Sequence, residues 1–159
     1  MNIDFVILAA GKGTRMGGDS PKVLANLGGQ PMLQNLINTT NNFKQSKRIV
    51  VVGYKANEVK KQIKTTKNTD WVKQNKQLGT AHAVKHALSS FRRGSVSVIL
   101  YGDVPLVSSA TLKKLISSAK NNNLALLTFN KENPAGYGRI VRKGRNAIDQ
   151  IVEEKDASA

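Results

Sequence analysis

The chain has 159 residues, 40% of them hydrophobic and 22% charged, and its 25 lysines and arginines against 10 aspartates and glutamates give a net charge of +15. This composition excludes an intrinsically disordered chain, and the absence of cysteine excludes disulfides, thiol catalysis and thiolate metal sites. The sequence contains no run of about 18 apolar residues that could span a membrane, and its N-terminus lacks the basic flank of a signal peptide. We therefore expect a cytoplasmic protein without a membrane partner.

Apolar β-branched runs alternate with helical patterns from the first residues onward. Strands are predicted at Asp4–Ala10, Arg48–Tyr54, Trp71–Gln74, Ser95–Tyr101 and Leu124–Asn130. Helices are predicted between and after them, at Pro31–Asn42, Ala56–Thr65, Thr80–Phe91 and Ser109–Asn122. Pro31 suits a first helical turn, and Ser108 or Ser109 suits an N-cap.

The alternation of strands and helices predicts the fold class. The runs "RIVVVGY" and "VSVILYG" are nearly continuous in apolar residues, which is typical of parallel strands covered on both faces. Short connections between strands and helices indicate right-handed βαβ units, and therefore an α/β, Rossmann-like, doubly wound and mostly parallel sheet. After Pro134 the pattern changes, and "GYGRIVRKGRNAIDQIVEE" predicts a C-terminal hairpin with its turn near residues 143–146. We expect one domain, or part of one.

The stretch "LAAGKGTRM", residues 8–16, joins the first strand to two glycines and two basic residues. In an open α/β sheet, ligands bind beyond the carboxyl ends of the strands. Gly11 and Gly13 let the backbone turn tightly and approach an anion. Lys12 and Arg15 supply charge for a polyphosphate, which an ordinary strand–helix turn would not need.

Neither of two well-known phosphate loops fits this stretch. A P-loop requires a lysine where Asp19 stands, and the dinucleotide fingerprint requires a third glycine where Met16 stands. Nor does an acid end the second strand, where "GYK" occupies the place of a ribose-binding carboxylate.

Asp103, in "LYGDVP", follows the fourth predicted strand at the same edge of the sheet. A carboxylate there, behind the small Gly102, can bind a hard cation that bridges phosphate oxygens. A turn or N-cap aspartate is an equally good interpretation of this stretch taken alone.

The segment "WVKQNKQLGTAHAV" places two glutamines before the start of a helix. The amides of Gln74 and Gln77 can both donate and accept, as the edge of a nucleobase requires. Gly79 and Thr80 offer backbone N–H groups at a helix N-terminus. Glutamines in a loop are usually solvated, so the segment by itself favours no single interpretation.

His82 and His86 lie one helical turn apart, but no third metal ligand stands beside them. We interpret both as surface or packing residues. The sequence contains no G-x-S-x-G or similar nucleophile motif.

The basic residues are dispersed among asparagines, as in "KANEVKKQIKTTKN", which favours solvated helix faces over a nucleic-acid groove. Aromatic residues make up only 5% of the chain, so few side chains are available to stack on the bases of single-stranded nucleic acid. We expect no specific nucleic-acid partner, and a basic nucleic-acid-binding module is the alternative from another class.

Several motifs together resemble one family. The stretches "LAAGKGTRMGGDSPKVL", "QNKQLGTAHAV", "LYGDVPL", "GYGRIVR" and "IVEEKDA" resemble the sugar-1-phosphate nucleotidyltransferases, and the match is collinear across nearly the whole chain. Within that family the chain is most similar to the uridylyltransferase domain of the bifunctional N-acetylglucosamine-1-phosphate uridylyltransferases/glucosamine-1-phosphate acetyltransferases. The L-x-x-G-x-G-T-R-M…P-K signature is specific to the superfamily. The motifs Q-L-G-T-A-H, Y-G-D-V-P and G-Y-G-R narrow the resemblance to the uridylyltransferase domain.

The resemblance implies a role for individual positions. Those implied to line the nucleotide through the backbone are Leu8, Ala9, Ala10 and Gly11, and those implied to read uracil are Gln74, Gln77, Gly79 and Thr80. Arg15 and Lys22 are the implied catalytic residues, which neutralise the triphosphate and the departing pyrophosphate, with Lys12 near them. Those implied to border the ribose and the metal are Tyr101, Gly102 and Asp103, with Asp103 as the Mg²⁺ ligand, and those implied to contact the amino sugar are Gly138 and Glu153.

The implied reaction transfers UMP from UTP to N-acetylglucosamine-1-phosphate. It gives UDP-N-acetylglucosamine, for peptidoglycan and lipopolysaccharide precursors, and pyrophosphate. The nucleophile is already an anion, so catalysis consists of positioning and charge neutralisation, with Mg²⁺ as cofactor. A cytidylyl- or guanylyltransferase is the alternative within the class, because the phosphate loop is shared and only base and sugar contacts differ.

Members of the family continue beyond the position of residue 159. The resemblance implies a remaining part of the catalytic domain, with a second metal-binding asparagine, and a trimeric left-handed β-helix that acetylates. We therefore expect residues 1–159 to be the N-terminal part of a nucleotidyltransferase domain, truncated after the hairpin. We expect a monomer or weak oligomer for this part, and a homotrimer for the full-length form.

Overall fold

The structure is a computed structural model that describes residues 1–13, 19–119, 123–144 and 147–157. The chain forms two compact units, residues 1–124 and residues 125–159, and each is described by itself. Within the described ranges, no helix has the length and apolar character needed to cross a membrane.

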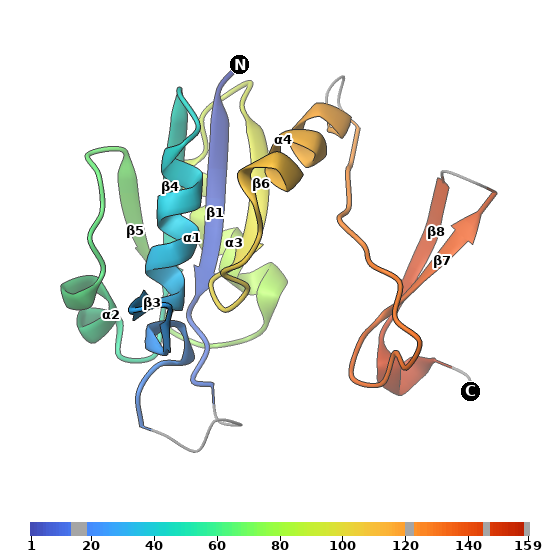
Figure 1. Ribbon diagram of the computed structural model, residues 1–159, viewed down its shortest axis with the longest axis horizontal. Helices are drawn as coiled ribbons and strands as arrows, with labels where there is room; N and C mark the ends of the chain where they lie inside the picture. Colours follow the sequence, from blue (N-terminus) through green and yellow to red (C-terminus); the bar gives the residue numbers. More distant parts are fainter. Residues whose placement is uncertain (14–18, 120–122, 145–146, 158–159) are drawn as a thin grey trace. The chain divides into compact units, whose positions relative to one another are not determined.

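Four parallel strands form the sheet of the first unit, in the order β5-β4-β1-β6 (Figure 1). Their bounds are Ile3–Ala9 for β1, Ser46–Val52 for β4, Thr69–Lys73 for β5 and Val96–Tyr101 for β6. The central strand β1 pairs along its length with β4 on one side and with β6 on the other. The strand order reverses between β1 and β6, which makes this pair the switch point of the sheet. The prediction of a doubly wound parallel sheet is confirmed.

Helices cover both faces of this sheet. Their bounds are Met32–Asn41 for α1, Ala56–Gln62 for α2, Thr80–Ala87 for α3 and Ser109–Ser118 for α4. Figure 1 shows α1 and α4 in front of the sheet and α3 behind it. The larger core packs α1, α2 and α4 against the front face, around Phe5, Ile7, Leu36, Val59 and Leu112. The smaller core packs α3 behind, around Val6, Ile49, Val51, Ala83 and Ala87.

Helix boundaries follow local signals in most places. Ser108 caps α4, because its hydroxyl accepts from the backbone N–H of Thr111 at 3.1 Å, as predicted. Pro31, predicted in the first helical turn, instead precedes α1 and ends a small hairpin. That hairpin pairs β2 (Asn26–Leu27) with β3 (Gln30–Pro31), and the pairing holds Pro31 in extended conformation.

Asp4 is a fully buried carboxylate near the amino end of β1. Burial raises the pKa of Asp4, but donors from Arg92 and Ser95 lower it by more, so the pKa lies below its usual value. The Ser95 hydroxyl donates at 2.5 Å, the Arg92 backbone N–H at 2.8 Å and the Arg92 guanidinium at 2.7 Å. This network ties β1 to the segment before β6 at the sheet edge opposite the ligand edge.

The exposed face of β6 contradicts the prediction that this strand is covered on both sides. Val98 and Leu100 are buried, whereas Ile99 is 47% and Tyr101 52% exposed. Helix α3 packs chiefly on β1, β4 and β5, so the described part of the chain leaves one face of β6 without a cover.

The predicted strand at Leu124–Asn130 is also wrong, because this segment has no regular structure. A strand requires a hydrogen-bonded neighbour, and no strand of the described chain pairs with this run. Its apolar side chains remain accessible, with Leu124 97% and Phe129 65% exposed.

The second unit contains the predicted hairpin. Strand β7 (Arg139–Lys143) pairs in antiparallel fashion with β8 (Ala147–Val152), and a short 3-10 turn follows at Glu154–Asp156. The hairpin is confirmed; residues 145–146 of its predicted turn lie outside the described residues.

Candidate active site

Two charged residues meet at the switch point of the sheet. Lys22 opens a 3-10 turn (Lys22–Leu24) after the loop that leaves β1, and Asp103 follows β6 by two residues. The Lys22 Nζ lies 2.9 Å from Asp103 Oδ2, and the two side chains are 39% and 35% exposed. The lysine predicted to bind phosphate and the aspartate predicted to bind the metal therefore lie together, where a ligand can reach both.

Gly102 allows the ends of β1 and β6 to approach closely. Its backbone N–H donates to the Leu8 carbonyl at 2.9 Å. A Cβ at residue 102 would lie 3.0 Å from that oxygen and 3.1 Å from Val23 Cγ1. A larger residue would push Asp103 away from the end of β1, so the small residue positions the carboxylate.

The opening loop folds back onto Lys22. Gly13 has a φ of +67°, and a Cβ there would lie only 2.5 Å from the Lys22 Cβ. Ala9 and Ala10 are buried, while Gly11 and Lys12 are exposed at the ligand edge. The Gly13 turn is therefore what sets the approach of the loop to Lys22.

Arg15, the second predicted catalytic residue, lies outside the described residues, as do its neighbours at 14 and 16–18.

A cluster that sequence reasoning missed holds the far end of this loop. The Tyr54 hydroxyl donates to Asp19 Oδ1 at 2.6 Å, and the Lys55 Nζ donates to Oδ2 at 2.5 Å. These donors, Lys55 first, lower the pKa of Asp19, and the same bonds raise the pKa of Tyr54 and of Lys55. The Lys12 and Lys55 ammoniums each lie 5.6 Å from the centre of the Tyr54 ring. The "GYK" turn, which carries no ribose-binding acid, thus binds Asp19, the first described residue after the predicted phosphate loop.

The predicted base-reading segment lies at the same edge. Gln74 follows β5, is only 3% exposed, and donates its side-chain N–H to the Gly79 carbonyl at 3.3 Å. The Gln77 amide nitrogen lies 2.7 Å from where a Cβ of Gly53 would stand, beside the carbonyl of Ala10. The structure thereby brings Gln77 to the ends of β4 and β1. Gly79 (φ +96°) caps α3, and the exposed Thr80 is its first residue.

Gly138 and Glu153 come together in the second unit. A Cβ on Gly138 would lie 3.3 Å from the Val152 carbonyl and 4.0 Å from the Glu153 carboxylate. The structure therefore brings these two residues together, and their role in binding the amino sugar stays a prediction.

Asp103 is the residue predicted to bind a metal at the switch point. In the described part of the chain, no group of three or more histidine, aspartate or glutamate side chains is arranged to hold a metal ion. His82 and His86 contact each other edge to face, with ring centres 4.6 Å apart, which agrees with a packing role. A single hard carboxylate suits Mg²⁺, which keeps several waters and takes substrate phosphates as ligands.

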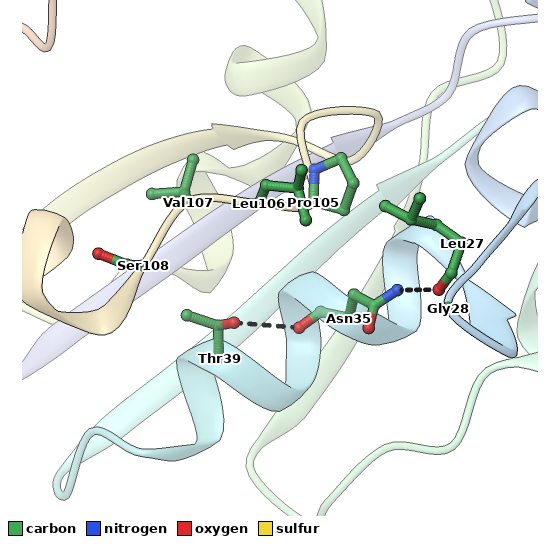
Figure 2. Close-up of a pocket in the computed structure, with 8 residues that line it drawn as sticks. All are labelled: Leu27, Gly28, Asn35, Thr39, Pro105, Leu106, Val107 and Ser108. Carbon is green, nitrogen blue, oxygen red and sulfur yellow. Dashed lines mark hydrogen bonds between the residues drawn. The ribbon is translucent and has the colours of Figure 1, made fainter.

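A separate pocket of about 420 Å³ lies between the β2–β3 turn, α1 and the segment after β6 (Figure 2). The residues that line it are Leu27, Gly28, Asn35, Thr39, Pro105, Leu106, Val107 and Ser108. The Asn35 amide donates to the Leu27 carbonyl and the Thr39 hydroxyl to the Asn35 carbonyl, so these polar groups already have partners. None of the predicted site residues lines this pocket.

A parallel doubly wound sheet, with a glycine turn, a lysine and a carboxylate at its switch point, is the arrangement expected of a nucleotidyltransferase domain. The chain belongs to the family of the MobA-like NTP transferase domain, whose family model matches residues 5–158. The enzyme class inferred from the motifs is confirmed.

Individual relatives agree with this family. The chain is 48% identical over 159 residues to the "Bifunctional protein GlmU" of Nitrosomonas europaea, and the match covers 99% of this chain and 35% of that protein. It is 43% identical over 159 residues to the protein of the same name from Idiomarina loihiensis, over 100% of this chain and 35% of that protein. These matches confirm the resemblance to the bifunctional uridylyltransferases, although the chain spans only 35% of each relative's length.

Among solved structures, the chain resembles HddC from Yersinia pseudotuberculosis complexed with GMP-PN. The TM-score is 0.72 at 24% identity, over 94% of this chain and 68% of that one. This likeness shows the fold.

Proposed function

We propose that the chain forms the nucleotide-binding part of an enzyme that transfers UMP from UTP to N-acetylglucosamine-1-phosphate. The Lys22–Asp103 pair, with 2.9 Å between Nζ and Oδ2 at the switch point, is the observation that carries this proposal. An ammonium and a carboxylate at one position suit a metal–triphosphate complex, because the lysine can bind phosphate oxygens and the carboxylate can bind the cation.

Asp103 would hold Mg²⁺ together with the phosphates of UTP. The bound ion would supply charge neutralisation at the phosphate oxygens that react. The Lys22 ammonium, which contacts Asp103 in the free protein, would exchange that carboxylate for a phosphate oxygen. This exchange conserves one charge-assisted hydrogen bond of Lys22, so it carries little penalty.

The remaining residues would orient the reactants. Gly11 and Gly13 would bring backbone N–H groups to the phosphates, and Arg15 would join Lys22 in neutralising pyrophosphate as it leaves. The sugar phosphate is already an anion near neutral pH, so no residue is required as general base. Gly138 and Glu153 would contact the amino sugar.

We further propose that residues 1–159 are the N-terminal part of the nucleotidyltransferase domain of a larger bifunctional protein that makes cell-wall precursors. The support is that relatives named as bifunctional match over 35% of their length.

The test compares two lysines of similar surroundings. Lys47 also forms an ion pair, 2.7 Å from Asp70, but at the amino end of the sheet. We expect Lys22→Gln to weaken Mg²⁺-dependent UTP binding about tenfold or more, since a charged hydrogen bond contributes about 1.5–3 kcal/mol. Lys47→Gln should leave binding unchanged. Binding is measured by calorimetry and thermal shift, and turnover by pyrophosphate release with N-acetylglucosamine-1-phosphate.

Two results would contradict the proposal. Preference for CTP or GTP over UTP would indicate another nucleotidyltransferase of the class. Binding to random DNA at about 150 mM salt, without any UTP-dependent shift, would indicate a nucleic-acid-binding module.

A further inference from the structure

The Gln74 side chain is a buried amide whose two hydrogens both have partners. Its nitrogen lies 3.3 Å from the Gly79 carbonyl oxygen and 2.9 Å from His82 Nδ1. The residue is 3% exposed, and its backbone N–H donates to the Val52 carbonyl at 2.8 Å. The two contacts of the amide nitrogen, in a buried side chain, give the amide one orientation.

The chemistry of these partners fixes the donor and acceptor of each group. A carbonyl oxygen only accepts, so the –NH₂ of Gln74 must face Gly79. The second amide hydrogen then points at His82 Nδ1, which must accept and is therefore unprotonated, with the proton on Nε2. Gln74 Oε1 makes no hydrogen bond with another residue that the structure describes, so it is left as an acceptor.

The backbone places His82 for this contact. Gly79 (φ +96°, ψ 179°) adopts a conformation suited to glycine and caps α3, and His82 is the third residue of that helix. The ring of His86, one turn on, packs edge to face on His82 at 4.6 Å and an interplanar angle of 82°. His82 therefore presents Nδ1 to Gln74 from the first turn of α3.

We propose that His82 is a positioning residue that sets the base preference of this site, by holding the Gln74 amide with its oxygen toward the nucleobase. This inference rests on the proposed function, in which the base of a nucleoside triphosphate lies against Gln74. An acceptor at this place pairs with the N3–H of uracil. The N3 of cytosine carries a lone pair instead, and would face the amide oxygen without a hydrogen bond.

The experiment measures the affinity ratio of UTP to CTP, with Mg²⁺, for the 159-residue chain and three variants. His82→Leu removes the acceptor, His82→Asn keeps an acceptor near the Nδ1 position, and His86→Ala removes the other histidine of the same helix. We expect a wild-type ratio of about ten or more, because CTP would leave the Gln74 amide oxygen buried without a hydrogen bond, which weakens binding. His82→Leu should lower the ratio about fivefold, which corresponds to the loss of one neutral hydrogen bond to the Gln74 amide. His82→Asn and His86→Ala should stay within about twofold of wild type, a change smaller than one hydrogen bond.

A second measurement needs neither nucleotide nor variant. Long-range ¹H–¹⁵N NMR of the wild-type histidines reports the tautomer, and we expect His82 to carry its proton on Nε2. A proton on Nδ1 would overturn the inference even if His82→Leu did not fold.

The outcomes separate the two proposals. If the wild type binds neither triphosphate, the proposed function fails, and the inference fails with it. If it binds both equally, or if His82→Leu keeps the full UTP preference, the inference alone is overturned.

Discussion

Gly13→Ala tests whether the glycine turn controls the Lys22–Asp103 pair. The φ of +67° costs an alanine about 1–2 kcal/mol. The new Cβ would also lie 2.5 Å from Lys22 Cβ and 3.3 Å from Lys22 Cα and N. No rotamer change of Lys22 relieves these contacts, because the atoms belong to the backbone or are bonded to it. By analogy with overpacked cores, their cost is about 1–3 kcal/mol.

We expect a loss of about 2–5 kcal/mol in the free energy of unfolding if the loop keeps its conformation. If the loop moves instead, Lys22 leaves Asp103, and Mg²⁺-dependent UTP binding is lost with a smaller loss of stability. Urea denaturation measures the first quantity and calorimetry the second.

Gly28→Ala is the matched control. Gly28 has nearly the same φ, +64°, but nothing lies within 4 Å of where its Cβ would stand. It should lose only about 1–2 kcal/mol and bind UTP like the wild type. Equal losses of stability in the two variants, with UTP binding intact in both, would refute the reasoning.

Three further predictions concern carboxylates. Asp103→Asn should weaken Mg²⁺-dependent UTP binding in calorimetry while barely changing the melting temperature without metal, since a partly exposed ion pair contributes at most about 1 kcal/mol. A large drop in the melting temperature of the metal-free protein would instead identify Asp103 as a structural turn residue. The pKa of Asp4 lies below its usual value, so its ionised form stabilises the fold above about pH 4 and this contribution disappears as the pH falls further. Urea denaturation between pH 7 and pH 3 should therefore show a flatter profile for Asp4→Asn, and parallel profiles would count against this role. Lys55 lowers the pKa of Asp19 more than Tyr54 does. In a ¹³C NMR titration, Lys55→Gln should therefore raise the pKa of Asp19 more than Tyr54→Phe does. The reverse order would be evidence against Lys55 as the main cause.

The sequence alone was sufficient to predict the four strands of the parallel sheet and the helices that cover it, and to suggest a phosphate ligand. Apolar β-branched runs such as Ile49–Val52 and a helical pattern such as that of Met32–Asn41 are local properties, so they predict strand and helix without knowledge of neighbours. The glycines near Lys12 are equally local, since a tight turn after a strand needs only the residues that make it. These signals were sufficient to predict a phosphate ligand at the carboxyl ends of the strands.

Only the tertiary structure decided which groups touch. Lys22 and Asp103 are 81 positions apart, and they meet because β1 and β6 are neighbours at the switch point, an order that no local pattern encodes. The bond between Gln74 and His82 depends in the same way on the course of the chain through Gly79. The apolar run Leu124–Asn130 shows the converse, because a strand-like pattern forms no strand without a partner. Periodicity records what each segment can bury, whereas contacts between distant side chains depend on how the sheet orders its strands.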